Sequence, residues 1–276
     1  MKTVCSLCPH HCAIDREERG FCRGRKNVDD VIICENYGKL TALALDPIEK
    51  KPLRRFFPGS FILSVGSYGC NMRCPFCQNY EIAMEGTTDA AVYFSPAELV
   101  TKALELTETA PGNLGVAFTY NEPLISYEYV MDTAKQLKKA GLKTVLVTNG
   151  MICEEPLKAL LPYIDAMNID LKGYTEAYYR WLKGDLKTVK NTIETSVIHC
   201  HVEVTTLIVP GKNDSEAEMA AEAAWLSSLD GEIPLHISRF FPRYQVKTGA
   251  PTSVDTIDQL CKIAKKHLKY VYAGNC

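Results

Sequence analysis

The sequence predicts an α/β fold in which a mostly parallel sheet forms a partial barrel, a (β/α)6 version of the eight-unit TIM barrel. From Phe61 onward, short apolar strands alternate with helical patterns, an order typical of βαβ units and a parallel sheet. About six such units fit, fewer than the eight of a complete barrel. The length of 276 residues is sufficient for one barrel domain.

The strands expected in this sheet are short runs of apolar and β-branched residues. They are Phe61–Val65, Gly115–Thr119, Lys143–Thr148, Ala166–Leu171, His201–Val209 and Leu235–Arg239, with a last short strand at Tyr270–Tyr272. In parallel α/β folds the loops at the carboxyl ends of the strands form the active site. We therefore expect the functional residues in the motifs that follow these strands.

The helices between the strands have recognisable ends. The segment Ser95–Glu98 offers an N-cap, a proline at the first helical position and a capping-box glutamate. A second helix is expected over Leu124–Ala140, because Gly141 is a favoured residue just past a helix end. Asp214-Ser215 opens an alanine-rich helix that runs to about Leu229.

The chain divides by composition into a small cysteine-rich N-terminal β extension and the barrel region, residues 1–58 and 59–276. In the extension, Val31–Ile33 and Leu40–Leu43 flank a turn at Asn36–Lys39. Two apolar runs around such a turn predict a β-hairpin. Pro58-Gly59 then separates the two regions.

Composition and charge restrict the function classes. The net charge of -2 argues against nucleic acid or an anionic membrane as the main partner. The sequence has neither an apolar run long enough for a membrane span nor the apolar core of a signal peptide at its start. We therefore expect a cytoplasmic protein. Reduced thiols are the rule there, so its twelve cysteines indicate metal binding better than disulfides.

Three cysteines, Cys70, Cys74 and Cys77, follow the first barrel strand with the spacing C-x3-C-x2-C. Three thiolates in one short loop can bind three irons of a cubane iron–sulfur cluster and leave the fourth iron open. The alternatives are a structural zinc site or unrelated thiols. Zinc sites usually close with four ligands, however, and the next cysteine after Cys77 is Cys153.

This spacing, with the aromatic Phe76 before the last cysteine, resembles the radical S-adenosylmethionine (radical SAM) superfamily. The resemblance implies a [4Fe-4S] cluster whose open iron chelates S-adenosylmethionine. One electron from the cluster would cleave the cofactor to a 5′-deoxyadenosyl radical that abstracts hydrogen, and Phe76 would lie near the adenine. It also implies reduced flavodoxin or ferredoxin as the electron donor.

Later strand ends resemble segments of pyruvate formate-lyase activating enzyme and its relatives. The first, Thr119–Pro123, reads TYNEP where the family has GGEP. By this likeness Glu122, and Asn121 by position, would bind the cofactor's amino group. The alternative is that Asn121 is a helix N-cap.

Two further segments resemble the TNG and DLK segments of the same enzymes, and the likeness places their polar residues near the cofactor. These residues are Thr148 and Asn149 after the third strand, and Asp170 and Lys172 after the fourth. A buried Asp170 must be paired or bound to a ligand, and Lys172 is an alternative partner for it.

Five residues of the last strands are candidates for a substrate pocket: His201, Glu203, Thr205, His236 and Arg239. The first three alternate along one strand and so share one face, which we expect to point into the barrel. The alternative for these three is a solvated face, and the alternative for His236 and Arg239 is that they are ordinary residues of the core and rim.

A second cysteine cluster comprises Cys5, Cys8, Cys12 and Cys22, with the spacing C-x2-C-x3-C-x9-C. Four soft ligands fit structural zinc or a second iron–sulfur cluster. Free thiols are the alternative, and His10 or His11 could replace one cysteine. The remaining cysteines are isolated in the sequence.

Together, CSLCPHHC, LDPIEKKPL, GCNMRCPFCQNYEI and FTYNEP resemble the radical SAM enzymes of the AmmeMemoRadiSam system. That likeness covers nearly the whole chain and implies Memo-like and AMMECR-like partner proteins. It names no reaction.

The chain departs from glycyl-radical activases in its N-terminal cysteines, in NEP for GGE, in Val147 where they commonly carry an aspartate, and in Thr205 where the formate-lyase activase has an arginine. Three function classes follow. They are a radical SAM enzyme acting on an unidentified substrate, a glycyl-radical enzyme activase, and a non-catalytic iron–sulfur or zinc electron-transfer protein.

Overall fold

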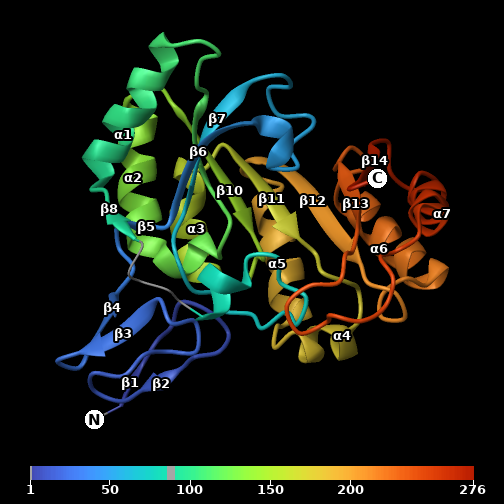
Figure 1. Cartoon of the computed structure of the whole chain (residues 1–276), viewed down its shortest axis with the longest axis horizontal. Coiled ribbons are helices and arrows are strands. Elements are labelled where there is room, and N and C mark those ends of the chain that lie inside the picture. The colour runs from blue at the N-terminus through green and yellow to red at the C-terminus, as the bar shows by residue number, and fades with distance from the viewer. Residues whose placement is uncertain (1, 86–90) are drawn as a thin grey trace.

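A computed structural model of the chain describes residues 2–85 and 91–276. Its centre is a twisted eight-stranded sheet that curves into a partial barrel, with helices on its outer side (Figure 1). In spatial order the strands are β6 (Ala42–Pro47), β7 (Phe61–Gly66), β9 (Gly115–Phe118), β10 (Lys143–Thr148), β11 (Ala166–Asp170), β12 (His201–Ile208), β13 (Leu235–Arg239) and β14 (Val271–Gly274).

The strands from β7 to β14 are all parallel, and β6 runs antiparallel to β7 at one edge. The six connections between the parallel strands all contain helices, as βαβ units require. The α/β partial barrel predicted from the sequence is thus confirmed. The helices are α1 (Pro96–Glu105), α2 (Tyr127–Lys139), α3 (Glu154–Leu160), α4 (Glu176–Trp181), α5 (Leu186–Ser196), α6 (Glu216–Leu229) and α7 (Val254–Ala264).

Short helical turns join these elements: η1 (Ile48–Lys50), η2 (Glu81–Glu85), η3 (Leu106–Glu108), η4 (Pro123–Ser126) and η5 (Leu161–Tyr163). Among the residues described, no helix combines the length and apolarity that a membrane crossing requires.

Local sequence signals set the helix ends as predicted. Ser95 and Glu98 form the capping box of α1, and Ser215 accepts a hydrogen bond from the third residue of α6. Gly141 follows α2 with φ +73°, which glycine adopts without strain. The helix expected from Leu124 instead begins as the tight turn η4, and the regular helix starts at Tyr127.

The predicted hairpin of the N-terminal region was wrong. Strand β4 (Val31–Cys34) pairs with β3 (Arg25–Val28) through the two-residue turn Asp29-Asp30. Both aspartates have positive φ, 49° and 64°, as in the type I′ turn that matches the twist of a hairpin.

The segment expected to pair with β4 has other partners. Residues 42–47 form β6 and pair with β7 over six residues, so the main sheet begins before residue 58. Short β5 (Lys39–Leu40) pairs with β8 (Val92–Tyr93), and β1 (Thr3–Val4) pairs with β2 (Ala13–Ile14).

The amino end of the barrel is closed by the segment after β6. Ile48 and Leu53 are fully buried and pack with Phe56 in one cluster with a residue from each of β7, β9, β10 and β11, namely Ile62, Ala117, Val145 and Ala166. Burying a side chain such as Leu53 contributes about 2 kcal/mol. We call this closed end the floor and the opposite, carboxyl end of the strands the rim.

Candidate functional site

The three predicted cluster cysteines lie in the loop that leaves β7 at the rim. Before them Gly69 has φ +87°, and a Cβ there would lie 2.4 Å from the carbonyl oxygen of Cys22. Only glycine fits such a close approach. The loop therefore passes directly over the N-terminal region, and the backbone N–H of Cys70 donates to the Cys22 carbonyl at 3.1 Å.

Asn121 holds the start of this loop, which we call the cluster loop (residues 67–78). Its side-chain oxygen accepts a hydrogen bond from the N–H of Ser67, and its amide donates to the carbonyls of Tyr68 and Gly69. The helix N-cap at this point is Glu122 rather than Asn121, because the Glu122 carboxylate accepts from the N–H of Leu124. Asn121 thus positions the cluster loop.

The thiols of the cluster loop lie in a buried and partly charged environment. Burial raises the pKa of Cys70 well above its ordinary value, and the nearby Glu122 carboxylate adds to this. Burial also raises the pKa of Cys77, and that of Cys74 to about 12, while the Lys172 ammonium opposes the rise at both. Metal binding would therefore have to displace the thiol protons.

Lys172 brings a positive charge to these thiols. Its Nζ lies 2.7 Å from Oδ2 of Asp170, so the two predicted cofactor residues pair with each other. Burial lowers the pKa of Lys172. The negative charges of Asp170 and of an ionised Cys74 raise it by more, so the ammonium stays charged.

The Glu122 carboxylate connects two strand ends. It accepts hydrogen bonds from Thr148 Oγ1 at 2.6 Å and from the N–H of Asn149 at 2.8 Å, in addition to that from Leu124 at 2.9 Å. Burial raises its pKa to about 7, even though these three donors lower it. Three donors leave part of the acceptor capacity of the carboxylate unused.

Asn149 lies against the cluster loop. Its amide nitrogen is 3.6 Å from the Cys70 sulfur and donates to the side-chain oxygen of Asn71 at 2.9 Å. The Asn71 amide in turn donates to the carbonyl of Met151 at 2.7 Å. These buried amides fix the loop after β7 to the loop after β10.

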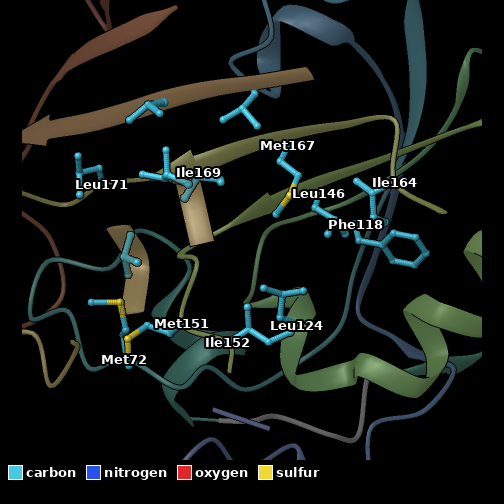
Figure 2. Close-up of a cluster of buried hydrophobic side chains, with 14 of the residues drawn as sticks. Met72, Phe118, Leu124, Leu146, Met151, Ile152, Ile164, Met167, Ile169 and Leu171 are labelled. Atoms are coloured by element: carbon cyan, nitrogen blue, oxygen red, sulfur yellow. The ribbon is translucent and has the colours of Figure 1, made fainter. Parts of the chain in front are cut away.

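Apolar side chains connect the same loop to the core. Met72 of this loop and Met151, which follows β10, lie near each other and belong to the main core (Figure 2). Phe76 is buried, with its ring 5.7 Å from that of Trp181 and 5.9 Å from that of Phe240. The cluster loop therefore rests on the core and has an aromatic wall beside it.

The comparisons with known proteins agree with this geometry. Residues 64–224 match the model of the radical SAM superfamily, a segment that begins in β7 and includes the cluster loop, Glu122, Asn149 and Lys172. The chain belongs to the radical SAM superfamily. Membership implies a [4Fe-4S] cluster and S-adenosylmethionine as cofactors.

Several curated relatives are similar along the chain. An uncharacterized protein of Methanocaldococcus jannaschii is 40% identical over 99% of this chain and 81% of its own length. A putative glycyl-radical enzyme activating enzyme of the same organism is 28% identical over 54% of this chain and 62% of its own. Pyruvate formate-lyase 1-activating enzyme of Escherichia coli K12 is 28% identical over 54% and 61%. The chain thus spans less than two thirds of either activating enzyme.

Solved structures share the fold. A radical SAM methyltransferase from Sphaerobacter thermophilus superposes with a TM-score of 0.58 at 17% identity, over 79% of this chain and 67% of that one. Streptococcus suis SuiB bound to S-adenosylmethionine also gives 0.58, at 14% identity, over 78% of this chain and 52% of SuiB.

The cysteines fit the cluster that a radical SAM protein holds. Among the residues described, no three His, Cys, Asp or Glu side chains are arranged so that they could hold a single metal ion. A cubane needs no such convergence, since each cysteine binds a different iron. Three thiols in one loop, a cation beside two of them and an amide beside the third suit a cluster with one open iron.

Three of the predicted substrate-pocket residues lie at the floor instead. Glu203 is fully buried, and His201 and His236 contact its carboxylate oxygens at 3.0 and 2.6 Å. The backbone N–H groups of Arg54 and Arg55, in the segment that closes the floor, donate to the same oxygens. The alternation along β12 correctly predicted that these side chains point into the barrel. The segment that closes the floor, residues 48–56, fills the space that they face.

The remaining two pocket candidates are also bonded within the chain. Thr205 donates to the side-chain oxygen of Asn168 at 3.0 Å, and Asn168 donates to the carbonyl of Pro52 in the floor segment. Arg239, at the end of β13, donates from Nε to the carbonyl of Thr252.

Sequence reasoning missed three residues that shape the radical SAM site. Asn71 and Arg73 lie between the cluster cysteines, and Arg73 donates to the carbonyls of Cys70 and Met72. Tyr120 has φ +70° at the place where the family has glycine. That departure, TYNEP for GGEP, was the signal that could have identified Tyr120.

Proposed function

We propose that this chain is an enzyme that reductively cleaves S-adenosylmethionine and abstracts a hydrogen atom from a substrate. The observation that carries this is the grouping of three thiols of one loop at the rim, with the Lys172 ammonium beside Cys74 and Cys77. When bound, the cluster and S-adenosylmethionine supply a 5′-deoxyadenosyl radical.

The residues around the thiols have separate roles in this proposal. Cys70, Cys74 and Cys77 hold the cluster. Lys172, which the Asp170 carboxylate keeps charged, offsets the negative charge of the thiolates. The amide of Asn149 donates toward the Cys70 sulfur, and such donors to sulfur tune the reduction potential of a cluster.

The proposed cofactor contacts combine the roles that the family resemblance implies with this geometry. Free lone pairs of Glu122 accept from the amino group of S-adenosylmethionine, and Thr148 and Asn149 hold that carboxylate in place. Asp170 accepts from hydroxyl groups of the ribose. The adenine lies near Phe76, within its aromatic wall.

The four motifs quoted above further support membership in the AmmeMemoRadiSam branch. In this proposal Memo-like and AMMECR-like proteins are the functional partners, and a reduced flavodoxin or ferredoxin is the electron donor.

Activation of a glycyl-radical enzyme is a second candidate function, which the similarity to two activating enzymes favours. One feature weighs against it. The segment after β13 lies on the cluster loop, where the N–H groups of Gln245 and Val246 donate to the Pro75 carbonyl and the ring of Tyr244 stacks on that of Tyr80 at 4.6 Å. This segment covers part of the cluster loop, which favours a small substrate over a folded polypeptide loop.

The test is cofactor cleavage. The protein is reconstituted anaerobically with iron and sulfide, reduced with dithionite and given S-adenosylmethionine, and 5′-deoxyadenosine is measured by chromatography. We expect product from the wild type and none from Cys74→Ala, since two thiolates cannot retain the cubane. Equal yields from both proteins would contradict the assignment.

Two controls separate the alternatives. Cys261→Ala removes a buried thiol of α7 outside both cysteine clusters and should leave the yield unchanged. A non-catalytic electron carrier would give no product from any variant. A glycine-centred radical, seen by electron paramagnetic resonance on an added glycyl-radical enzyme, would select the activase function.

A further inference from the structure

The four N-terminal cysteines surround one cavity. Cys5, Cys8, Cys12 and Cys22 all line a space of about 10 Å³, with apolar side chains completing its wall. Cys5 and Cys22 are buried. The backbone brings them together, because the N–H of Cys5 donates to the Cys12 carbonyl at 3.0 Å and that of His11 to the Cys8 carbonyl at 3.1 Å.

Arg25 is a second, independent observation that points to a negatively charged ligand in this cavity. Its side chain lines the same cavity and is only 8% exposed. One nitrogen pairs with Glu128, but the buried Nε has no hydrogen-bond partner among the described residues. A buried guanidinium donor without a partner is costly, and a thiolate metal centre would supply the missing acceptor.

The cavity adjoins the cluster loop. Beyond the bond from Cys70 to the Cys22 carbonyl, His10 Nε2 lies 2.7 Å from the carbonyl oxygen of Asn71. Since the side chain of Asn71 accepts a hydrogen bond from Asn149, the contact with His10 joins the N-terminal cysteine segment to the surroundings of the Cys70 sulfur.

From these observations we propose that Cys5, Cys8, Cys12 and Cys22 bind one zinc ion, which holds the cluster loop in place through Asn71 and Cys22. Binding converts four thiols and Zn²⁺ into a tetrahedral thiolate centre of charge −2 and releases four protons. Arg25 offsets that charge. The site is structural, because all four zinc positions are taken by protein sulfur.

The size of the cavity favours a single ion over a second iron–sulfur cluster. A space of about 10 Å³ holds roughly one water-sized sphere, whereas a cubane places eight iron and sulfide atoms between its ligands. The proposal rests on this shared cavity and on the unpartnered Nε of Arg25. As at the cluster loop, no three of these sulfurs in the described residues converge on one point, so the size of the cavity distinguishes zinc from a cubane, and the sulfurs must close on the ion.

Metal content tests the site independently of cofactor chemistry. Zinc, iron and sulfide are counted in anaerobically purified wild-type protein and in a variant with Cys70, Cys74 and Cys77 all changed to Ala. We expect about one zinc ion per chain in both, with about four irons in the wild type and none in the variant. The inference is overturned by wild-type protein with about eight irons and no zinc, by the absence of bound metal, or by loss of zinc from the triple variant.

A single substitution locates the zinc. Cys8→Ser should reduce zinc to well below one ion per chain, while Cys34→Ser, which changes a half-buried thiol of the same region outside the cavity, should retain it. Zinc retained in full by Cys8→Ser, or lost equally from both variants, would overturn the assignment. If Cys8→Ser does not accumulate, zinc release from the wild type by a thiol-modifying reagent, followed with a colorimetric chelator, gives the same answer. Four thiols protected until zinc leaves support the site, and free reaction of all four overturns it.

Discussion

The two ends of the barrel bury polar groups in different ways. At the floor, Glu203 receives two histidines and two backbone N–H groups, so that each carboxylate oxygen has two partners. At the rim, Glu122 has three donors for its two oxygens, so part of its acceptor capacity is unused.

The pKa values of these two carboxyl groups are shifted in opposite directions as a result. Burial raises the pKa of both, but at Glu203 the hydrogen bonds prevail and lower it to about 2. At Glu122 burial prevails and raises the pKa to about 7. The floor holds a carboxylate with four hydrogen-bond partners, which stabilises the fold. At the rim, a bound cationic partner would favour the ionised form of Glu122.

The largest effect on stability should come from the floor. Glu203→Ala leaves two histidines and the N–H groups of Arg54 and Arg55 without their acceptor, and breaking a buried network of this kind costs about 3–5 kcal/mol. Urea unfolding followed by circular dichroism measures the loss. Glu203→Gln, which keeps one acceptor oxygen, should lose less. A loss below about 1 kcal/mol for the alanine variant would remove the distinction between floor and rim.

Acid should weaken the floor next. The pKa of Glu203 is 4.5 in the unfolded chain and about 2 in the folded one, so its ionised form contributes about 3 kcal/mol above pH 4.5. That contribution is lost as the pH falls from 4.5 toward 2. It is measured as the difference in unfolding free energy between the parent and Glu203→Gln, both with Cys70, Cys74 and Cys77 changed to Ser so that acid release of the cluster plays no part. A difference independent of pH over this range would contradict the low pKa.

Glu122 should show the reverse behaviour. Its folded pKa lies above the unfolded value of 4.5, so the protonated carboxyl stabilises the fold below pH 4.5 and this contribution is lost as the pH rises through 7. Glu122→Ala leaves the donors of Thr148, Asn149 and Leu124 without their acceptor, so its folding is checked by circular dichroism before binding is measured. We expect S-adenosylmethionine to bind more weakly by about 1–3 kcal/mol, as for one lost charged hydrogen bond. Equilibrium binding to the reconstituted protein gives the dissociation constant, and an unaltered value would place Glu122 outside the cofactor site.

The smallest effect is expected between the two ends. Thr205→Val removes one hydrogen bond to Asn168 and should cost about 0.5–1.5 kcal/mol of unfolding free energy. The yield of 5′-deoxyadenosine should not change. A large loss of that yield at normal stability would return Thr205 to the substrate pocket.

The sequence predicted the parts of the fold that depend on local chemistry. Strand β10 has the predicted bounds, and the caps of α1 and α6 lie where Ser95 and Ser215 indicated. The hairpin was mispredicted because pairing depends on which partner is available, and β7 offers the segment 42–47 a longer ladder than β4 could.

The candidate site, like the fold, was predictable where it depends on local sequence. Spacing alone brought Cys70, Cys74 and Cys77 together, because they belong to one loop. The alternation of His201, Glu203 and Thr205 gave the face of β12 but not the height along the barrel, which depends on a plug built from residues 48–56 far away in the sequence. Asn71 could not be recognised, since its role arises only where three loops meet.

The segment that closes the floor also contacts the edge of the open side of the sheet. Edge strands β6 and β14 are not paired with each other in the described part of the chain. At the floor, however, the guanidinium of Arg55 lies over the ring of Tyr270 at 4.2 Å and that of Arg54 over Tyr272 at 5.6 Å. These contacts hold β14 and the residue before it to the floor segment, so we expect any separation of β6 from β14 to be larger at the rim, beside the cluster loop, than at the floor.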